Sequence, residues 1–273
     1  MTDPSAVLRS SDGIAHLRLS RPLVRNALRA EDVVLLHRLL DQVEDSDVRA
    51  VVLSGDGPAF CAGRDLSDAE PATEDARAIL AATYNPLLRR LRYLALPTFA
   101  AVHGACLGVG LGLALACDVT VVAGSARLGS PFARIGAVLD SGGHHHLVHR
   151  LGEHRALELI YTGRLLTGAE AAQWGLVNRA VPDDRVLDEV LATASRVAAG
   201  PTQAFRLSKD IAHRITDEGL SLDAVLAAEA DAQGVASRTH DYTEGITAFQ
   251  HKREPRFTGA PPAGSPGHLR VHP

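Results

Sequence analysis

The sequence predicts an α/β fold built from a strand, a helix and a second strand, with this unit repeated once. Three apolar runs indicate the strands: residues 49–54 (RAVVLS), 98–102 (TFAAV) and 118–123 (DVTVVA). Short continuous apolar runs bounded by turn residues are typical of strands that are buried on both faces of a sheet. Helical patterns over residues 31–43 and 75–94 separate these runs, and such alternation favours a parallel sheet.

Weaker patterns place the remaining elements. Residues 15–19 (AHLRL) alternate in polarity, which predicts a first strand that ends at the turn of Arg21 and Pro22. After the third apolar run, the patterns predict short strands at residues 126–129 and 176–181, and helices at residues 153–161, 168–174 and 186–199.

The composition changes near residue 200 and divides the chain. From Pro201 onward the pattern is helical, with apolar residues three to four apart over residues 203–215 and 222–237. We expect an α/β core over residues 1–200, a helical region over residues 201–258 and a disordered tail over residues 259–273, where Pro, Gly and His leave little apolar surface to bury.

Charge and hydropathy exclude several classes of protein. The 273 residues carry a net charge of −4 and no stripe of Lys and Arg with interleaved aromatic residues, so no nucleic-acid partner is expected. No apolar segment is long enough to cross a membrane and no signal peptide is visible, which predicts a cytoplasmic protein without a membrane partner. Three cysteines without CxxC spacing, Cys61, Cys106 and Cys117, are expected to be reduced and buried.

A glycine-rich stretch over residues 103–118 (HGACLGVGLGLALACD) is the strongest candidate for a functional site. Glycine recurs at positions 104, 108, 110 and 112, and the stretch leads into an apolar helix pattern over residues 113–117. Uncovered amide groups at a helix start favour negative charge, so the stretch suits an oxyanion. Close packing of the glycines against a neighbouring element is the alternative explanation.

A second glycine-containing loop over residues 62–66 (AGRDL) also follows a buried strand and precedes a helix. Because neighbouring parallel strands end at the same edge of a sheet, both loops are expected to aim N–H groups at one point. Two such donors would form an oxyanion hole, in which each donor contributes about 3 to 4 kcal/mol to acyl chemistry.

Four motifs in order, FCAGRDL, HGACLGVGLGLALACD, SPFARIG and AFQHKREPRF, resemble the enoyl-CoA hydratase/isomerase (crotonase) superfamily. The resemblance covers about residues 8 to 257 and includes LSRPLVRNAL near the start. It implies a crotonase-like spiral of ββα units with a C-terminal helical trimerisation region, and homotrimers that often pair into hexamers. It also implies an acyl-CoA substrate, no further cofactor, and a thioester oxygen bound by the backbone N–H groups of Arg64 and Val109.

The chain departs from the family pattern at the positions of the residues that would act as catalytic acid and base. Hydratases of this family carry two glutamates, at the positions that Gly112 and Phe132 occupy here. Ordinary hydratase activity is therefore not expected. Asp140, in the sequence VLDSGG, matches the catalytic aspartate of dienoyl-CoA isomerases, of chlorobenzoyl-CoA dehalogenases and of the phenylacetate-pathway isomerase. The alternative is that Asp140 only caps the helix that is expected to start there.

The resemblance also implies contacts with coenzyme A. A basic side chain at Arg25 would contact the phosphates of coenzyme A, but an exposed arginine without a ligand is an equally good explanation. For Lys252, a solvated position at a helix end is the equally good alternative. Phe249 and Lys252 would reach coenzyme A from an adjacent subunit. The complete expected binding set is Arg25, Ala27, Ala62, Asp65, Leu66, Gly108, Phe132, Phe249 and Lys252.

The histidines at positions 144–146 are not expected to bind a metal. Consecutive residues of a helix point about 100° apart, so three in a row do not converge on one ion. Three hypotheses for function remain: an acyl-CoA isomerase that uses Asp140 to move a proton, a hydratase or other crotonase reaction on an unusual acyl group, including nucleophilic attack by Asp140, and an acyl-CoA-binding protein without catalysis.

Overall fold

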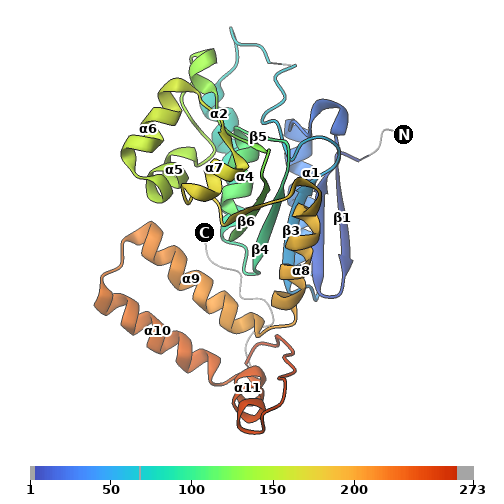
Figure 1. The fold of residues 1–273 in the computed structure, drawn as a ribbon, viewed down its shortest axis with the longest axis vertical. Helices are drawn as coiled ribbons and strands as arrows, with labels where there is room; N and C mark the ends of the chain where they lie inside the picture. The colour runs from blue at the N-terminus through green and yellow to red at the C-terminus, as the bar shows by residue number, and fades with distance from the viewer. Residues whose placement is uncertain (1–3, 68, 263–273) are drawn as a thin grey trace.

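A six-stranded sheet and a smaller three-stranded sheet form the centre of the protein (Figure 1). The computed structural model describes residues 4–67 and 69–262. The large sheet has the order β1-β2-β3-β4-β6-β9, with the strands β1 Ala6–Ser11, β2 Ile14–Leu19, β3 Ala50–Gly55, β4 Thr98–Val102, β6 Val119–Ala123 and β9 Arg179–Val181. The strands β5 Ala105–Leu107, β7 Arg127–Gly129 and β8 Leu166–Thr167 form the small sheet.

The chain passes repeatedly from the large sheet to the small one and then into a helix. β4 continues into β5 and then α4, and β6 continues into β7. The strands β2, β3, β4, β6 and β9 are parallel to one another, as are β5 and β7. Gly104 makes the turn between β4 and β5, where a Cβ atom would lie 2.0 Å from the carbonyl oxygen of Pro58. This arrangement confirms the expected α/β spiral of ββα units.

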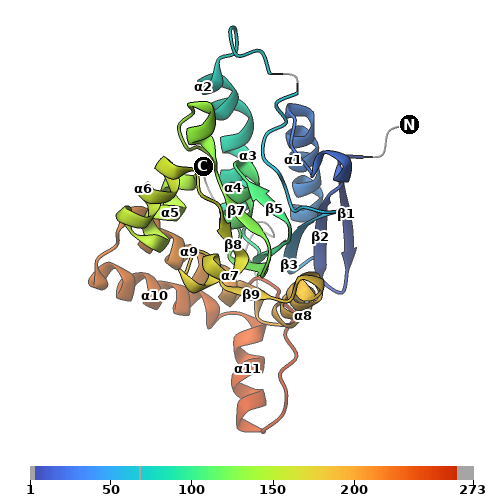
Figure 2. The same cartoon turned by 45° about the horizontal axis from the view of Figure 1, so that its top comes forward.

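Helices cover the sheets and enclose α4 (Figures 1 and 2). They are α1 Ala30–Glu44, α2 Ala76–Ile79, α3 Asn85–Arg92, α4 Val109–Ala116, α5 Gly143–Leu151, α6 Glu153–Thr162, α7 Gly168–Gln173 and α8 Val186–Ala198. A π-helical turn, Leu80–Tyr84, joins α2 to α3, and short 3₁₀ turns lie at Pro22–Val24, Phe132–Ile135 and Asp183–Arg185. Every residue of α4 is buried, which explains why its sequence is apolar on all sides.

Several elements differ from the sequence prediction. The short strands β5 and β8 were not predicted, and the helix expected over residues 75–94 is divided into α2, the π-helical turn and α3. The strand β1 was not predicted, although Asp12 and Gly13 have the positive φ angles, 52° and 74°, of a two-residue hairpin turn. The strand β9 covers only the last part of residues 176–181. The helix α4 begins at Val109, four residues before the apolar pattern that predicts it, because Gly110 and Gly112 are themselves helical.

Three further helices, α9 Thr202–Glu218, α10 Leu222–Ala236 and α11 His240–Gln250, follow the core. Two views show α11 at the end of the molecule away from α2 (Figures 1 and 2). None of the helices in residues 4–67 and 69–262 combines the length and apolarity needed to cross a membrane. Most of the expected tail, residues 263–273, lies outside the described residues.

Arg49 fastens these helices to the large sheet. Its guanidinium donates to Thr202 Oγ1 at 2.9 Å, to the carbonyl oxygen of Phe257 at 3.1 Å, and to the carbonyl oxygen of Gly200. Buried Asp241 holds the chain next to Phe257, because its carboxylate accepts from the backbone N–H groups of residues 258 and 259. We call the contacts of Arg49 the Arg49 latch.

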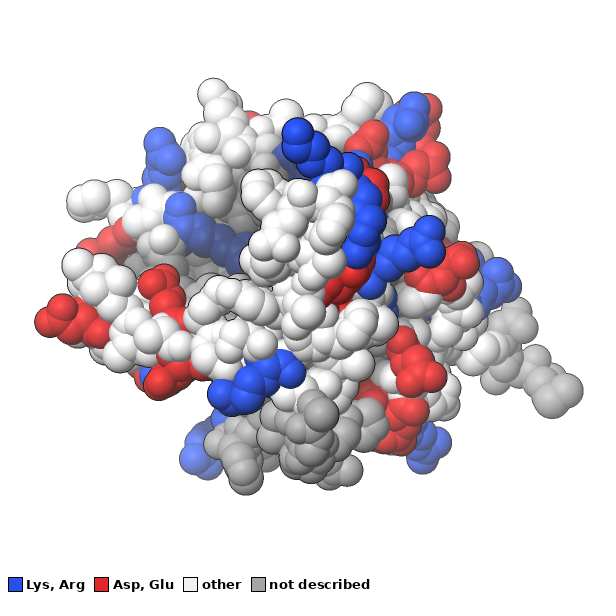
Figure 3. Space-filling view, turned by 90° about the horizontal axis from the view of Figure 1, so that it is seen from below, with Lys and Arg blue, Asp and Glu red and all other residues white. Residues whose placement is uncertain are grey.

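Acidic and basic side chains are interspersed on the face seen from below in Figure 3, with uncharged atoms over most of its centre. The helices α10 and α11 expose several large apolar side chains: Leu222, Leu226, Ile246 and Phe249. Single exposed apolar residues are common on proteins, but four on two neighbouring helices leave this region suited to a protein contact.

Candidate active site

The two glycine-containing loops lie side by side, as the sequence predicts. The backbone N–H of Cys61 donates to the carbonyl oxygen of Ala105 at 3.0 Å, and that of Leu107 donates to the carbonyl oxygen of Cys61 at 2.9 Å. Gly63 has a φ of 106°, and a Cβ atom there would lie 3.1 Å from the Leu107 carbonyl oxygen. Glycine at this position therefore lets the loops approach closely.

Two backbone donors of these loops have no acceptor among the described residues. The N–H of Val109 is at the first position of α4, where no intrahelical acceptor exists. The N–H of Arg64 is also free, because the adjacent strand contact uses the Gly63 carbonyl oxygen and the Asp65 N–H instead. Within residues 4–67 and 69–262, neither donor has a hydrogen-bond acceptor. Two unpaired N–H groups on neighbouring loops are the kind of donor from which an oxyanion hole is built.

Phe132 lies next to the second of these loops. A Cβ atom on Gly108, the residue before Val109, would lie 3.4 Å from the Phe132 ring. The ring stands where family hydratases carry their second glutamate, so this side of the site is apolar.

Ser141 occupies the space beside Gly112. A Cβ atom on Gly112 would lie 2.5 Å from the Ser141 carbonyl oxygen and 2.9 Å from its Cβ. Ser141 is buried and has a φ of 55°, an unusual conformation for a serine. A glutamate at position 112 could not be accommodated without moving Ser141. The missing carboxylate is thus part of the packing and not an isolated change.

Asp140 supplies a carboxylate close to this point. Its Oδ1 accepts a hydrogen bond of 2.7 Å from the Ser141 hydroxyl, and the side chain is half-buried. Burial raises the pKa of Asp140, while the Ser141 hydroxyl and the positive charge of Arg64 oppose the increase. Gly142 is the N-cap of α5, and no side chain caps this helix. Capping of α5 therefore does not explain why an aspartate stands at position 140.

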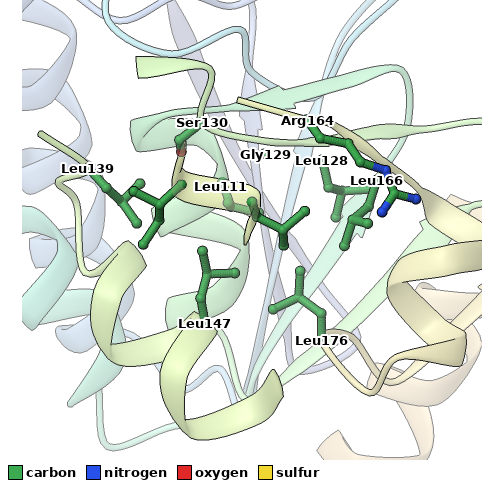
Figure 4. Close-up of a pocket in the computed structure, with 11 residues that line it drawn as sticks. Leu111, Leu128, Gly129, Ser130, Leu139, Leu147, Arg164, Leu166 and Leu176 are labelled. Carbon is green, nitrogen blue, oxygen red and sulfur yellow. The ribbon is translucent and has the colours of Figure 1, made fainter. Parts of the chain in front are cut away.

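Apolar side chains of α4, α5, β7 and β8 surround a small cavity near Leu139 (Figure 4). A cavity of about 10 Å³ is lined mainly by leucines, including Leu111, Leu139 and Leu147. Leu139 folds back against Gly143, where a Cβ atom would lie 2.7 Å from its side chain. A cavity this small and apolar does not hold ordered water. Leu139, which precedes Asp140 in the chain, therefore belongs to an apolar wall.

The residues expected at the coenzyme A edge also come together. The Ala62 N–H donates to the carbonyl oxygen of Arg25 at 2.9 Å, which brings residues 25–28 alongside the loop of Arg64. Arg25 has a φ of 53° and its side chain is exposed. Asn26 stabilises this conformation, because its buried side chain donates hydrogen bonds to two backbone carbonyl oxygens. The position of Arg25 leaves it free for an anionic ligand.

Asp65 has a different role from the one that a binding residue would need. Its Oδ2 accepts from Arg21 and from Arg29, each at 3.0 Å, and its Oδ1 accepts from Ser67. Hydrogen bonds from Ser67, followed by those from the two arginines, hold the pKa of Asp65 well below its usual range. The carboxylate fastens the loop, so only the backbone of Asp65 could face a ligand. Leu66, which follows it, is exposed.

The structure does not bring Phe249 and Lys252 to these residues. Phe249 lies near the end of α11 and is 84% exposed, and Lys252 follows it. Figures 1 and 2 both show α11 at the far end of the molecule from α2 and the loop before it. Any contact of these two side chains with a ligand at the site would have to involve another subunit.

The three consecutive histidines face in different directions. His144 is exposed, His145 lies 3.6 Å from Asp217 on α9, and His146 is buried. In the part of the chain that the structure describes, no group of three or more His, Cys, Asp or Glu side chains could hold a metal ion. The histidine run therefore belongs to the packing of α5.

Buried His146 predicts a pH dependence of stability. Burial, together with the charge of Arg150, lowers its pKa to about 3, against about 6.5 in the unfolded chain. Between these values the unfolded chain binds the additional proton, so stability falls as the pH decreases below about 6.5. We expect the variant His146→Phe to lose less unfolding free energy than the wild type across this range in urea titrations. Equal losses, with exposed His144→Phe as control, would contradict this account.

Two residues of the site were not predicted from the sequence. Ser141 could have been suspected, because it lies between Asp140 and two glycines. Glu74 gives no such signal: its Oε1 accepts from the Arg64 guanidinium across a loop of ten residues. Only the folded chain reveals this ion pair, in which Arg64 is 31% and Glu74 17% exposed.

Comparisons with known proteins show to which family the chain belongs. The family model for enoyl-CoA hydratase/isomerase matches residues 9–260. A Rhodobacter capsulatus protein named "Probable enoyl-CoA hydratase" is 40% identical over 91% of this chain and 96% of its own length. The 1,2-epoxyphenylacetyl-CoA isomerase of Escherichia coli is 36% identical over 90% of this chain and 95% of its own length.

Solved structures give the same result. The crystal structure of an enoyl-CoA hydratase from Bacillus anthracis superposes with a TM-score of 0.86 at 30% identity, and the match covers 93% of this chain and 99% of that one. The sequence motifs, the spiral of ββα units and these similarities lead to one conclusion. The chain belongs to the enoyl-CoA hydratase/isomerase family, the crotonase superfamily.

Proposed function

We propose that the protein is an acyl-CoA isomerase that moves a proton within an enoyl thioester. The backbone N–H groups of Arg64 and Val109 would bind the thioester oxygen, and Asp140 would carry the proton. The observation that supports this most is the packing of Ser141 against Gly112, which leaves Asp140 as the carboxylate beside the oxyanion loops. A single carboxylate is sufficient for isomerisation, because the group that removes a proton from one carbon can return a proton to the other.

The proposed step balances without any added reactant. The carboxylate of Asp140 removes a proton from the carbon next to the thioester of a 3-enoyl-CoA, and the electron pair of the C–H bond moves into a dienolate. The negative charge then lies on the thioester oxygen, between the two N–H groups. Protonated Asp140 returns the proton to the far carbon, which gives the conjugated 2-enoyl-CoA. No cofactor other than the coenzyme A of the substrate takes part.

Hydration is the second candidate reaction, because both hydratase and isomerase names occur among the relatives. The R. capsulatus relative carries a hydratase name, and the E. coli relative carries an isomerase name. Hydration needs a group to activate water and a group to protonate carbon, which the two family glutamates would supply. Gly112 and Phe132 provide neither. The remaining candidates are another reaction on an unusual acyl group, with Asp140 as nucleophile, and binding without catalysis.

The reaction in D₂O separates these candidates. We expect a 3-enoyl-CoA to become a 2-enoyl-CoA without a gain in mass equal to one water. Where protonated Asp140 exchanges its proton with D₂O in the dienolate complex, deuterium should enter at the far carbon, and through the reverse reaction at the carbon next to the thioester. Mass spectrometry measures both quantities, and calorimetry measures binding in parallel. Addition of water would favour the hydratase. Binding of the thioester without exchange or conversion would favour the binding protein.

We also propose that a neighbouring subunit completes the coenzyme A site in a homotrimer or a hexamer. The exposed apolar side chains of α10 and α11 support a contact of this kind, and so does the position of Phe249 and Lys252 far from their own oxyanion loops. Arg25, Ala27 and Ala62 would contact coenzyme A from the subunit that holds its thioester, along with the backbone of Asp65, the Leu66 side chain and Gly108. Phe132 would line the acyl pocket.

A further inference from the structure

Asp140 and Ser141 belong to a tight turn that precedes α5. The N–H of Gly143 donates to the carbonyl oxygen of Asp140 at 2.8 Å, and the two central residues of the turn, Ser141 and Gly142, have φ angles of 55° and 75°. Two successive positive φ angles are characteristic of a type I′ turn. Glycine, asparagine and aspartate are the residues that such positions favour, so the backbone of this turn does not by itself require a serine.

Packing against α4 holds Ser141 in this conformation. The residue is 4% exposed, and a Cβ atom on Gly112 would lie 2.5 Å from its carbonyl oxygen and 2.9 Å from its Cβ. A residue with a positive φ angle that is not glycine carries backbone strain, which persists only where the surrounding structure enforces it. Such residues are concentrated at functional sites. The strained conformation of Ser141 therefore directs attention to what its side chain does.

The hydroxyl of Ser141 occupies one oxygen of the Asp140 carboxylate. Ser141 Oγ donates to Asp140 Oδ1 at 2.7 Å. The other oxygen, Oδ2, accepts no hydrogen bond from any residue within 4–67 and 69–262. The χ2 torsion of an aspartate is broad when no contact restrains it, and the hydroxyl supplies such a restraint here. The carboxylate consequently has a fixed rotation and one oxygen without a partner.

We propose that Ser141 is a positioning residue for Asp140, whose hydroxyl holds Oδ1 and leaves Oδ2 as the oxygen that takes the proton from one carbon and gives a proton to the other. The inference rests on the proposed function, because it assigns the step of Asp140 to one of its two oxygens. The hydroxyl proton stays on Ser141 Oγ throughout, and no bond to Ser141 forms or breaks. Ser141 acts on the reaction only through the carboxylate.

A purely structural role for the hydroxyl leads to a different expectation. If it only supported the turn, its removal would lower stability, and any loss of activity would follow the fraction of folded protein at every pH. A donor that positions the carboxylate also favours its ionised form. The Ser141 hydroxyl counteracts the effect of burial on the pKa of Asp140, so the titration midpoint of Asp140 should rise when the hydroxyl is removed.

The variants Ser141→Ala and Ser141→Gly separate the two roles. Both remove the hydroxyl, but glycine adopts a positive φ without strain, so Ser141→Gly should unfold at a higher urea concentration than Ser141→Ala. In both variants, kcat for conversion of a 3-enoyl-CoA should fall on the order of 10-fold where Asp140 is ionised, because orientation is lost and binding is not. KM should stay within about twofold.

Carboxyl carbon NMR of the full-length protein, labelled at aspartate, measures the midpoint of Asp140 without substrate. The variant Asp140→Asn identifies the resonance. We expect the midpoint to rise by about one pH unit in Ser141→Ala and in Ser141→Gly, since a hydrogen bond to a charged group is lost. The shift should be the same in both variants although their stabilities differ.

Ser125→Ala is the matched control, because the Ser125 hydroxyl donates to the carboxylate of Asp183 at an exposed turn after β6. It should change neither kcat nor the midpoint of Asp140. An unchanged kcat or an unchanged midpoint in Ser141→Gly overturns the inference. So does a loss in Ser141→Ala as large as that in Asp140→Asn, which would make Ser141 the proton carrier. If both midpoints rise while the wild type converts no 3-enoyl-CoA, the hydroxyl holds the carboxylate as inferred and the proposed function is refuted.

Discussion

The variant Asp140→Asn should lose deuterium exchange by about 10²- to 10⁴-fold, because general acid–base catalysis by one positioned group contributes this much. Asparagine preserves the shape of the side chain and keeps an oxygen that can accept from the Ser141 hydroxyl. Binding of the acyl-CoA should persist, since the N–H groups of Arg64 and Val109 belong to the backbone. Exchange measured by mass spectrometry and binding measured by calorimetry test the two parts separately.

Stability measurements test whether Asp140→Asn loses activity only because the variant is unfolded. Burial raises the pKa of Asp140 above its unfolded value, so its ionisation destabilises the folded protein as the pH rises through the unfolded value. The neutral asparagine does not have this cost, and Asp140→Asn should unfold at neutral pH at the same urea concentration as the wild type or a higher one. Asp188→Asn, on the exposed side of α8, serves as the control for a lost carboxylate. Undiminished exchange in Asp140→Asn would assign the proton to another group.

The variant Gly112→Glu should not become a hydratase, although it restores a glutamate at the family position. Its Cβ would lie 2.5 Å from the Ser141 carbonyl oxygen, and its carboxylate would enter a buried space. We expect a loss of unfolding free energy of about 2 to 4 kcal/mol, from overpacking and the buried charge together. The displaced Ser141 should take Asp140 with it, so exchange is lost and no hydration is gained.

Two alanine variants show whether close packing is the cause. In a helix, alanine is normally better than glycine by about 1 kcal/mol. Gly234 in α10 has open space around it, and Gly234→Ala should stabilise the protein. Gly112→Ala should destabilise it, because the contact with Ser141 outweighs the helix propensity. Urea unfolding measures both changes, and a more stable Gly112→Ala would refute the steric explanation.

The central strands of the large sheet could be predicted from local sequence patterns, whereas the edge strand β1 could not. The strands β3, β4 and β6 are buried on both faces, so their sequences are continuously apolar and stand out. The strand β1 lies at the edge, and half of its residues are exposed. Its pattern is weak for that reason, and only the Asp12-Gly13 turn indicates it.

The candidate site, too, could be predicted from the sequence only in part. Glycines with a required conformation indicate the oxyanion loops, because position 108 and position 63 both have positive φ angles. The contacts of Asp140 depend on tertiary packing instead. Ser141 faces Gly112 across 29 positions of chain, and no local pattern records that contact. The ion pair of Arg64 and Glu74 is invisible for the same reason.

The Arg49 latch has a consequence for the order of folding. Its hydrogen bonds join residues that are 151 to 208 positions apart in the sequence. The strand β3 can pair with its neighbours as soon as β4 exists, whereas the guanidinium has no partner until residue 200 and then residue 257 have been synthesised. Contacts of such long range form slowly and late. During translation, therefore, the sheet and its two glycine-containing loops can assemble before the Arg49 latch forms.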